Sequence, residues 1–381
     1  MPIKMLNKNF ILINLFKCIL ICFSFNAFAD PENQQTIKLA VSNATTGPAS
    51  QLGIRLNQGA NAYFHRINNE GGIAGKTIKI EQLDDGYEPF KTLKNTQKFL
   101  AQDDIFAFFN YVGTPTTHAI IKHIKNSQVP FLMPFTGAEF LRTPVIDNIY
   151  HLRASYYQEA EQQINYLVDS KEITDIGLLV QADEFGTSVE KGYIMALKER
   201  GLKPTVTTRY RRNTNDVALA LSILKAKNVQ AVAFVGTYEP FAQLINLAYQ
   251  QEFTPFFTSV SFVSSRDLFQ RLKQPSNVLV TEVMPDPNVC YEDICLQFIR
   301  DMKAQGIEKV DQILFEGYLN AFVFVEVAKQ CDKALSQRCL LEKMAQFEYH
   351  QKGLSISFKD KDHQGLSSIF LNFFSPTFNN Q

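Results

Sequence analysis

The sequence has 381 residues, of which 45% are hydrophobic and 20% charged, an ordinary composition for a globular protein of about two domains. Lys and Arg together number 38, as do Asp and Glu, so the net charge is zero and does not indicate a nucleic-acid-binding protein. Phe is abundant at 32 residues and Trp is absent, which suits a well-packed core or an apolar cleft.

The N-terminal segment has the features of an export signal. It contains three basic residues, Lys4, Lys8 and Lys17. A short apolar run covers Cys18–Phe25, and the A-x-A sequence Ala27–Ala29 follows it. We therefore expect residues 1–29 to be a signal peptide that is cleaved after Ala29, and the mature protein to be exported. The apolar run is too short to span a membrane.

Strand-like and helix-like runs then alternate along the chain. In the first half, strands are predicted at Ile37–Ser42, Lys76–Leu83, Ile105–Val112 and Val129–Phe135, and helices at Leu52–Asn69, Pro89–Gln102 and Thr117–Asn126. In the second half, strands are predicted at Ile176–Gln181, Val229–Gly236 and Asn277–Val283, and helices at Phe185–Arg200, Pro240–Gln251 and Ile313–Lys329. Two further strands are predicted within residues 353–360 and 367–374.

This alternation predicts an α/β protein with parallel sheets and helices on both faces. The mature chain of roughly 350 residues is too long for one core, so two lobes are expected. The helix at Ile313–Lys329 is strongly apolar but contains Glu316 and Glu326, which favours a buried core helix over a membrane span.

The glycines of "NNEGGIAGKTIKI" have two interpretations. A phosphate-binding loop follows a strand and opens a helix, whereas Gly71, Gly72 and Gly75 follow a helix and open a strand. The carbonyl end of a helix repels anions, so Gly71 or Gly72 is better interpreted as a left-handed helix stop. Asp84 and Asp85 then fall at the carboxyl end of a strand, where open α/β sheets place their ligands.

Four cysteines remain after signal removal. Cys290, Cys295, Cys331 and Cys339 form an even set in an exported chain, which predicts disulfides. Cys290–Cys295 and Cys331–Cys339 are the simplest pairing. A metal site is the alternative, but neither pair is a C-x-x-C and no His lies nearby.

Several motifs occur in a fixed order along the chain. They are Gly47–Pro48, the Asn68–Pro89 segment, Tyr111–Thr117, Pro134–Arg142 and Asp362–Gly365. Together they resemble the type I periplasmic binding proteins, in the branched-chain amino acid (leucine, isoleucine, valine) receptor family of ABC importers. The resemblance covers roughly Thr36–Phe374.

The resemblance implies two Rossmann-like lobes joined by three crossovers, with a ligand cleft between them. Lobe 1 is expected at residues 36–153 plus 284–349, and lobe 2 at residues 154–283 plus 350–381. A small ligand is expected to close the lobes, and an ABC permease in the inner membrane is the expected partner.

Two loops of the first lobe are candidates for ligand contact. Thr114 lies between a strand and a helix, where free N–H groups favour an anion, although an N-cap role is the alternative. In the family this loop contacts a ligand carboxylate, which implies contacts by Gly113 and Thr114. The resemblance implies that Phe135, Thr136 and Gly137 of the second loop contact an amino group, although an ordinary turn is the alternative.

Candidates in the second lobe rest on the resemblance as well. Phe185 stands where the family places an aromatic ring over the ligand, although a core position is the alternative. Thr237 and Tyr238 follow the strand that ends at Gly236. Ser261 lies near the position where amino-acid receptors carry an acid that pairs with the ammonium group.

No acidic residue occurs from Phe253 through Ser265. An unpaired buried ammonium group is costly, so either Asp85, Glu239 or Asp183 compensates or the ligand is not an α-amino acid. We expect a small carboxylate, an amide or an aromatic acid.

Enzymatic interpretations are weak. None of the six histidines forms a metal-binding motif, there is no G-x-S-x-G, and Ser188–Lys191 matches S-x-x-K in a way that chance explains. We therefore expect no catalytic residues, no metal and no cofactor. Two functions remain: a transport receptor that delivers ligand to an ABC permease, or a periplasmic sensor that signals through a membrane kinase, cyclase or chemoreceptor.

Overall fold

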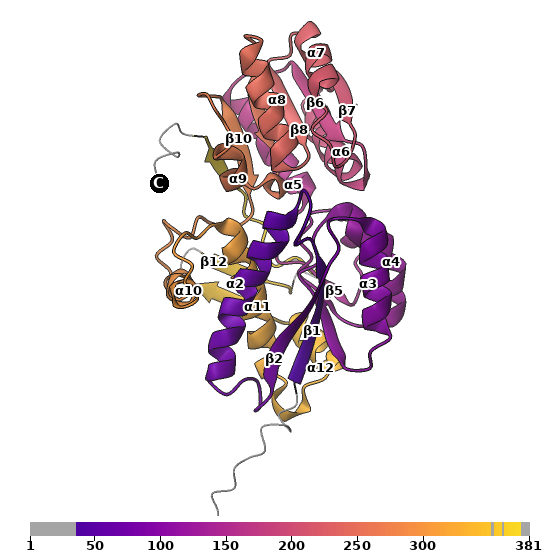
Figure 1. The fold of residues 1–381 in the computed structure, drawn as a ribbon, viewed down its shortest axis with the longest axis vertical. Coiled ribbons are helices and arrows are strands. Elements are labelled where there is room, and N and C mark those ends of the chain that lie inside the picture. Colours follow the sequence, from indigo (N-terminus) through magenta and orange to yellow (C-terminus); the bar gives the residue numbers. More distant parts are fainter. Residues whose placement is uncertain (1–35, 352–353, 360–361, 375–381) are drawn as a thin grey trace, which may run out of the picture. The chain divides into compact units, whose positions relative to one another are not determined.

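The structure, a computed structural model, describes residues 36–351, 354–359 and 362–374 (Figure 1). The predicted signal peptide lies outside the described residues. Within them the strands form sheets of five, six and two strands.

The first sheet is parallel and has the order β2-β1-β3-β4-β5. Its strands are β1 (Thr36–Asn43), β2 (Thr77–Asp84), β3 (Ile105–Phe109), β4 (Phe131–Leu132) and β5 (Ile149–Tyr150). Side chains alternate between its faces. Leu39 and Val41 pack in one core cluster with α2 (Ser50–Asn69) and α11 (Gln312–Lys329), while Ala40 packs toward α3 (Pro89–Leu100) and α4 (Thr114–Ser127).

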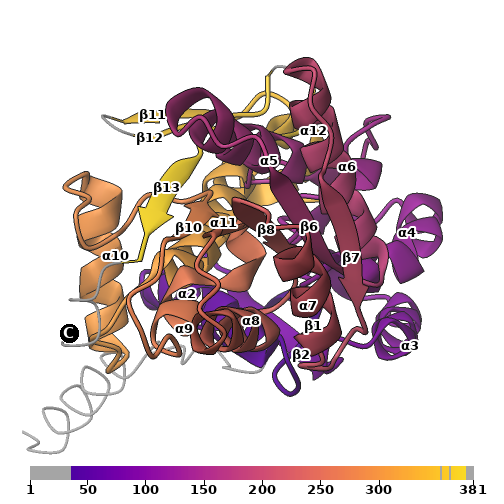
Figure 2. The same cartoon turned by 90° about the horizontal axis from the view of Figure 1, so that it is seen from above.

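The second sheet has the order β13-β10-β9-β8-β6-β7, and its strand pairs are parallel except β10 with β13. Its strands are β6 (Ile176–Gln181), β7 (Val206–Tyr210), β8 (Ala231–Val235), β9 (Phe256–Ser259), β10 (Val278–Glu282) and β13 (Phe370–Phe373). Leu178 packs toward α5 (Tyr156–Ile164) and α6 (Glu184–Glu199), whereas Leu179 packs toward α7 (Ala218–Ala226) and α8 (Tyr238–Gln250). Figure 2 shows these two helix pairs on opposite sides of β6 and β8.

The remaining elements complete the described part of the chain. They are the π-helical turn η3 (Asn165–Ser170), the 3₁₀ turns η2 (Glu139–Leu141), η4 (Ser261–Val263) and η5 (Asp332–Ala334), helices α9 (Ser265–Phe269), α10 (Asp293–Ala304) and α12 (Gln337–Met344), and the hairpin β11 (Glu348–Gln351) with β12 (Leu354–Ser357).

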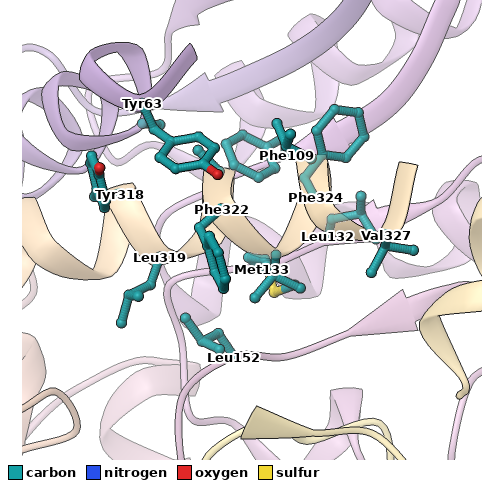
Figure 3. Packing of buried hydrophobic residues seen from close by; sticks show 14 of the residues in the cluster. Tyr63, Phe109, Leu132, Met133, Leu152, Tyr318, Leu319, Phe322, Phe324 and Val327 are labelled. Atoms are coloured by element: carbon teal, nitrogen blue, oxygen red, sulfur yellow. The ribbon is translucent and has the colours of Figure 1, made fainter. Parts of the chain in front are cut away.

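Helices α2 and α11 approach closely because glycines face the opposite backbone. A Cβ atom on Gly59 would lie 1.9 Å from the Leu314 carbonyl oxygen, and one on Gly317 would lie 2.0 Å from the carbonyl oxygen of Leu56. Large rings then fill the space along α11, where Phe324 packs against Phe109 (Figure 3). The helix is buried over most of its length, as its composition predicts.

The chain passes between the two larger sheets three times within the described residues: from β5 to β6, from β10 to the α10–α11 segment, and from β12 to β13. The segment Asp362–Gly365 lies at the first of these passages, where Gly365 N donates to His151 O at 2.8 Å and Arg142 donates to Gln364. The residue boundaries of the lobes stay a proposal.

Most predicted elements are confirmed, but the strands at Ile105–Val112 and Val129–Phe135 are shorter than predicted. Asn110 and Met133 have positive φ values of 52° and 55°, which interrupt extended backbone. Val112 and Phe135 then pair through an isolated bridge. Both predicted strands therefore turn before they end and bring their last residues into loops.

The helix-stop interpretation of the glycines is confirmed. Gly71 and Gly72 have φ values of 103° and 74°, and Gly72 N donates to Ile67 O at 2.9 Å, which closes the end of α2.

The disulfides Cys290–Cys295 and Cys331–Cys339 form as predicted, with Cα atoms 5.9 and 6.0 Å apart. Glu292 lies close to Cys290 and Cys295, but the disulfide occupies both sulfurs, so this group does not offer a free metal site. No helix among the described residues is both long and apolar enough to cross a membrane.

Candidate functional site

Two hydroxyl groups meet at the carboxyl edge of the first sheet. The Oγ1 atoms of Thr114 and Thr136 are 2.8 Å apart, and both residues are fully buried. Thr114 follows β3 and Thr136 follows β4, so the early turns in those two strands bring the hydroxyls together. The structure thus brings together two loops that were predicted separately, from the sequence, to contact a ligand.

The start of α4 leaves Thr114 available for another role. Gly113, with φ of 107°, occupies the N-cap position, and the Thr117 hydroxyl donates to Gly113 O at 2.7 Å. The Thr116 hydroxyl also donates to backbone carbonyls. Thr114 is therefore neither the N-cap nor bonded back to its own helix, which removes the alternative interpretation of this residue.

Glycine is required at position 113 for a second reason. A Cβ atom there would lie 2.4 Å from a ring carbon of Tyr87. Gly137 is similarly enclosed, since its Cβ would lie 2.6 Å from Tyr156 N. Both predicted glycines thus allow aromatic side chains to approach the loops.

Beside the hydroxyl pair lies an aromatic cluster that consists of Tyr87, Phe135, Tyr156, Phe185 and Phe262. Phe262 is its centre: its ring centroid is 4.7 Å from Phe185, 5.6 Å from Tyr87 and 5.9 Å from Phe135. Tyr156 extends the cluster, 5.3 Å from Phe185. All five side chains are fully buried.

The cluster is built by loops and helices of both sheets. Tyr87 and Phe135 follow β2 and β4, whereas Phe185 belongs to α6 and Phe262 follows β9. Phe262 therefore joins the two sheets, whereas Phe185 contacts Phe262 and Tyr156 and is a core residue of the same packed group. The contact of Phe185 with a ligand stays a prediction.

Thr237 and Tyr238 lie elsewhere. Thr237 precedes α8, and the Tyr238 ring lies under the Arg271 guanidinium, with 4.6 Å between Cζ and the ring centroid. Tyr238 packs in the cluster of α7 and α8 rather than with Phe185. Their contact with a ligand stays a prediction.

Ser261 meets an acid that the sequence analysis missed. Its backbone N and Oγ donate to the two carboxylate oxygens of Glu159 at 2.7 and 2.9 Å, and Thr281 Oγ1 donates to the same carboxylate at 2.7 Å. Burial raises the pKa of Glu159, although Arg153 and these hydrogen bonds oppose the shift. An acid thus lies behind the Ser261 loop instead of within it.

Arg153 links this loop to α11. Its Nε and Nη2 donate to the two carboxylate oxygens of Glu316 at 3.0 and 3.2 Å, and Nη2 also donates to Ser261 Oγ at 3.2 Å. Its Cζ lies 3.9 Å from the centroid of Phe135. Burial alone would lower the pKa of Arg153, but the charges of Glu316 and Glu159 raise it overall.

Two of the three acids that the sequence offered as substitutes have structural roles, and the third is exposed. Asp85 accepts hydrogen bonds from Ser42 Oγ at 2.9 Å, Thr92 Oγ1 at 3.0 Å and Tyr87 N at 2.9 Å. Asp183 caps α6 by accepting from the Phe185 and Gly186 N–H groups. Glu239 is exposed at the start of α8.

Arg153, Tyr156 and Glu159 were not among the predicted site residues. They lie on the passage from β5 into α5, which the sequence analysis did not assign to an element. The one available signal was Glu316, an acid inside an otherwise apolar helix, which requires a buried partner.

Comparison with known proteins identifies the family of this chain. A family described as periplasmic binding protein matches residues 36–371. The chain belongs to the periplasmic binding protein family. The two-lobed type I fold and the similarity to branched-chain amino acid receptors that the sequence motifs indicated are confirmed.

Among solved structures of periplasmic binding proteins, a possible leucine/isoleucine/valine-binding protein from Rhodopirellula baltica is 28% identical, with a TM-score of 0.84 over 90% of this chain and 95% of that one. A substrate-binding periplasmic protein from Ralstonia solanacearum is 25% identical, with a TM-score of 0.82 over 90% of this chain and 98% of that one.

A curated relative, the Leu/Ile/Val/Thr-binding protein of Salmonella typhimurium, is 21% identical over 228 residues. The match covers 60% of this chain and 61% of the relative, so the similarity spans about three-fifths of that protein's length.

Glu282 lies close to the other buried acids of this periplasmic binding protein. Its burial predicts that the stability of the folded protein depends on pH. It is buried at the end of β10 and accepts from Ser265 Oγ at 2.5 Å. Burial, with a smaller contribution from Glu159, raises its pKa to about 8. The folded state therefore binds this proton more tightly than the unfolded state does, and the associated stability is present below about pH 4.5 and lost as the pH rises to about 8.

We expect Glu282→Gln, which keeps an acceptor for Ser265, to be more stable than the wild type at pH 8.5 by on the order of a few kcal/mol. The advantage should shrink as the pH falls toward 5. Urea unfolding of both proteins at several pH values measures the difference in their free energies of unfolding. Titrating groups that both proteins share contribute equally and do not affect this difference. An advantage that does not change with pH would contradict the assignment.

Proposed function

We propose that this protein is the solute-binding receptor of an ABC importer and binds a small carboxylate, amide or amino-acid-like molecule between its lobes. The observation that carries the proposal is the buried Thr114–Thr136 hydroxyl pair beside an aromatic cluster from both sheets. Polar groups that fix orientation next to apolar walls are typical of small-molecule sites.

The mechanism follows from the origin of these residues. Because Thr114 and Thr136 belong to loops of the first sheet and Phe185 to a helix of the second, a ligand that contacts all three bridges the lobes. Such a ligand binds the closed form better than the open form and shifts the population toward it. The closed form is then the one that the permease recognises.

The named relatives favour transport over sensing. The Salmonella protein is named for binding leucine, isoleucine, valine and threonine, and none of the relatives reported above is described as a sensor. We therefore propose an inner-membrane ABC permease as the partner, and no nucleic acid or cofactor.

We also infer that residues 1–29 direct export and that the mature protein works in the periplasm. The two disulfides support this location, because such bonds persist in oxidising compartments. N-terminal sequencing of the exported protein should begin at Asp30. A chain that retains the first 29 residues would contradict the cleavage.

The binding function is tested with a pair of threonine variants on α4. The ligand is first found by a thermal-shift screen of amino acids, amides and carboxylates on refolded mature protein, where ligand at 100 times Kd adds about 2.7 kcal/mol of stability. We expect Thr114→Val to weaken binding about 10-fold to 100-fold, since it removes a hydrogen bond to a charged or polar group.

Thr117→Val is the matched control. It removes a hydroxyl that is equally buried but bonded to its own helix, so it should lower stability slightly and leave affinity within about twofold. Calorimetric titration measures both variants. Equal affinities of Thr114→Val and the wild type would exclude Thr114 from the site.

A further inference from the structure

The guanidinium of Arg153 has donors that the protein does not use. An arginine offers five N–H groups in a fixed fork. Nε and Nη2 donate to Glu316 and Ser261, whereas Nη1 is buried and has no hydrogen-bond partner among the described residues. Arg153 as a whole is only 1% exposed. A buried charged donor without an acceptor is costly, so this position calls for an acceptor from outside the chain.

Two tyrosine hydroxyls in the aromatic cluster are in the same situation. Tyr87 Oη and Tyr156 Oη are both buried without a well-formed hydrogen bond among the described residues, although the Thr114 and Thr136 hydroxyls lie close enough to Tyr156 to lower its pKa by hydrogen bonding. Burial raises the pKa of Tyr87 well above its ordinary value, and it raises that of Tyr156 although Arg153, Thr136 and Thr114 oppose the shift. Both hydroxyls therefore keep their protons and can act as donors.

These donors belong to one neighbourhood. Tyr156 N donates to Gly137 O at 2.8 Å, next to Thr136, and the Tyr87 ring packs against Gly113, next to Thr114. Phe135 carries the Arg153 guanidinium on its face and contacts Phe262 at the centre of the aromatic cluster. The unpaired groups of Arg153, Tyr87 and Tyr156 therefore lie around one aromatic cluster.

The acids of this neighbourhood are already occupied. Both oxygens of Glu316 accept from Arg153, and both oxygens of Glu159 accept from Ser261, with Thr281 adding a third bond. Arg153 Nη1 can only donate, so an ammonium group would leave it unpaired, whereas the tyrosine hydroxyls can donate or accept. The unpaired guanidinium donors thus match an anionic oxygen and not a cation.

We propose that the ligand is a monocarboxylate without an α-ammonium group, whose carboxylate accepts from Arg153 Nη1 and Tyr156 Oη beside the Thr114–Thr136 pair. Its apolar body packs against the aromatic cluster. This inference rests on the proposed function and narrows its ligand class from three to one. The bond from Arg153 is the stronger of the two, because its donor and acceptor are both ionised.

The negative charges of Glu316 and Glu159 near Arg153 repel an anionic ligand. The strength of this repulsion limits how tightly a carboxylate binds. Glu316 forms the ion pair, and Glu159 also interacts with the Arg153 charge. Burial raises the pKa of both acids, so a ligand carboxylate favours proton uptake by one of them. The excess negative charge is then reduced on binding, while the unused Nη1 donors gain their acceptor.

Matched probes separate the ligand classes. Leucine, 4-methylpentanoate and 4-methylpentanamide share one carbon skeleton, as do phenylalanine, 3-phenylpropanoate and 3-phenylpropanamide. Calorimetric titration of the refolded mature protein should show at least one plain carboxylate binding 10-fold or more tighter than its amide and its amino acid.

The role of Arg153 is tested in a charge-balanced variant, because removing one member of a buried ion pair alone endangers folding. Arg153→Gln combined with Glu316→Gln should weaken carboxylate binding at least 10-fold and leave amide binding within threefold. Glu316→Gln alone keeps the guanidinium and removes a negative charge, so it should bind the carboxylate at least as well as the wild type. If the double variant does not fold, Arg153→Lys keeps the charge but loses the fork, and should also weaken carboxylate binding 10-fold.

The outcomes are distinct. Tighter binding of the amino acid or amide overturns the monocarboxylate class but leaves the receptor function standing. Carboxylate binding that is unchanged in the double variant and in Arg153→Lys overturns the role of Arg153. Absence of binding by every probe overturns this inference, whereas the proposed function is overturned only if the thermal-shift screen also finds no ligand.

Discussion

Arg153 is buried where the chain leaves the first sheet, and its charge requires acceptors from elements of both sheets. Glu316 on α11 supplies two oxygens, and Ser261 after β9 supplies a third. A buried charge without such partners is strongly destabilising. The positions of α11, the Ser261 loop and the start of α5 are therefore mutually constrained around one guanidinium, and this arrangement also places Phe135 and Tyr156 beside the Thr114–Thr136 pair.

Apolar packing supplies the free energy that offsets the cost of burying these polar groups. Helix α11 is buried on nearly all sides, and the glycines at its contact with α2 let the two backbones approach without strain. The edge of the second sheet is held by further buried polar pairs, among them Glu282 with Ser265. Since the carboxyl edges of the two sheets carry these groups, the site occupies the place where α/β sheets commonly bind their ligands.

Sequence patterns predicted those elements whose signal is local. The apolar run Ile176–Gln181 matches β6 residue for residue, and α2 and α11 end close to their predicted limits. The strands before Thr114 and Thr136 were predicted too long, because positive φ values at Asn110 and Met133 leave no clear mark on the hydrophobic pattern. The cysteine pairing was predictable because each pair is close in sequence.

The polar half of the site was not predictable in the same way. Ser261 and Glu159 are 102 positions apart, and Arg153 and Glu316 are 163 apart, so no window of the sequence contains both partners. The absence of an acid from Phe253 through Ser265 was visible, but its meaning depends on Glu159, which the fold brings behind that loop. Local patterns thus identify the loops that carry a site, whereas the fold decides which charges meet there.

The most direct measurement is a crystal structure of the protein purified from its own cells with the ligand that it carries. The account predicts electron density for a small molecule that contacts Thr114 and Thr136 on one side and Phe185 on the other. Density located elsewhere, for example in the cavity of about 280 Å³ lined by Ile245, Tyr249 and Phe253, would contradict it.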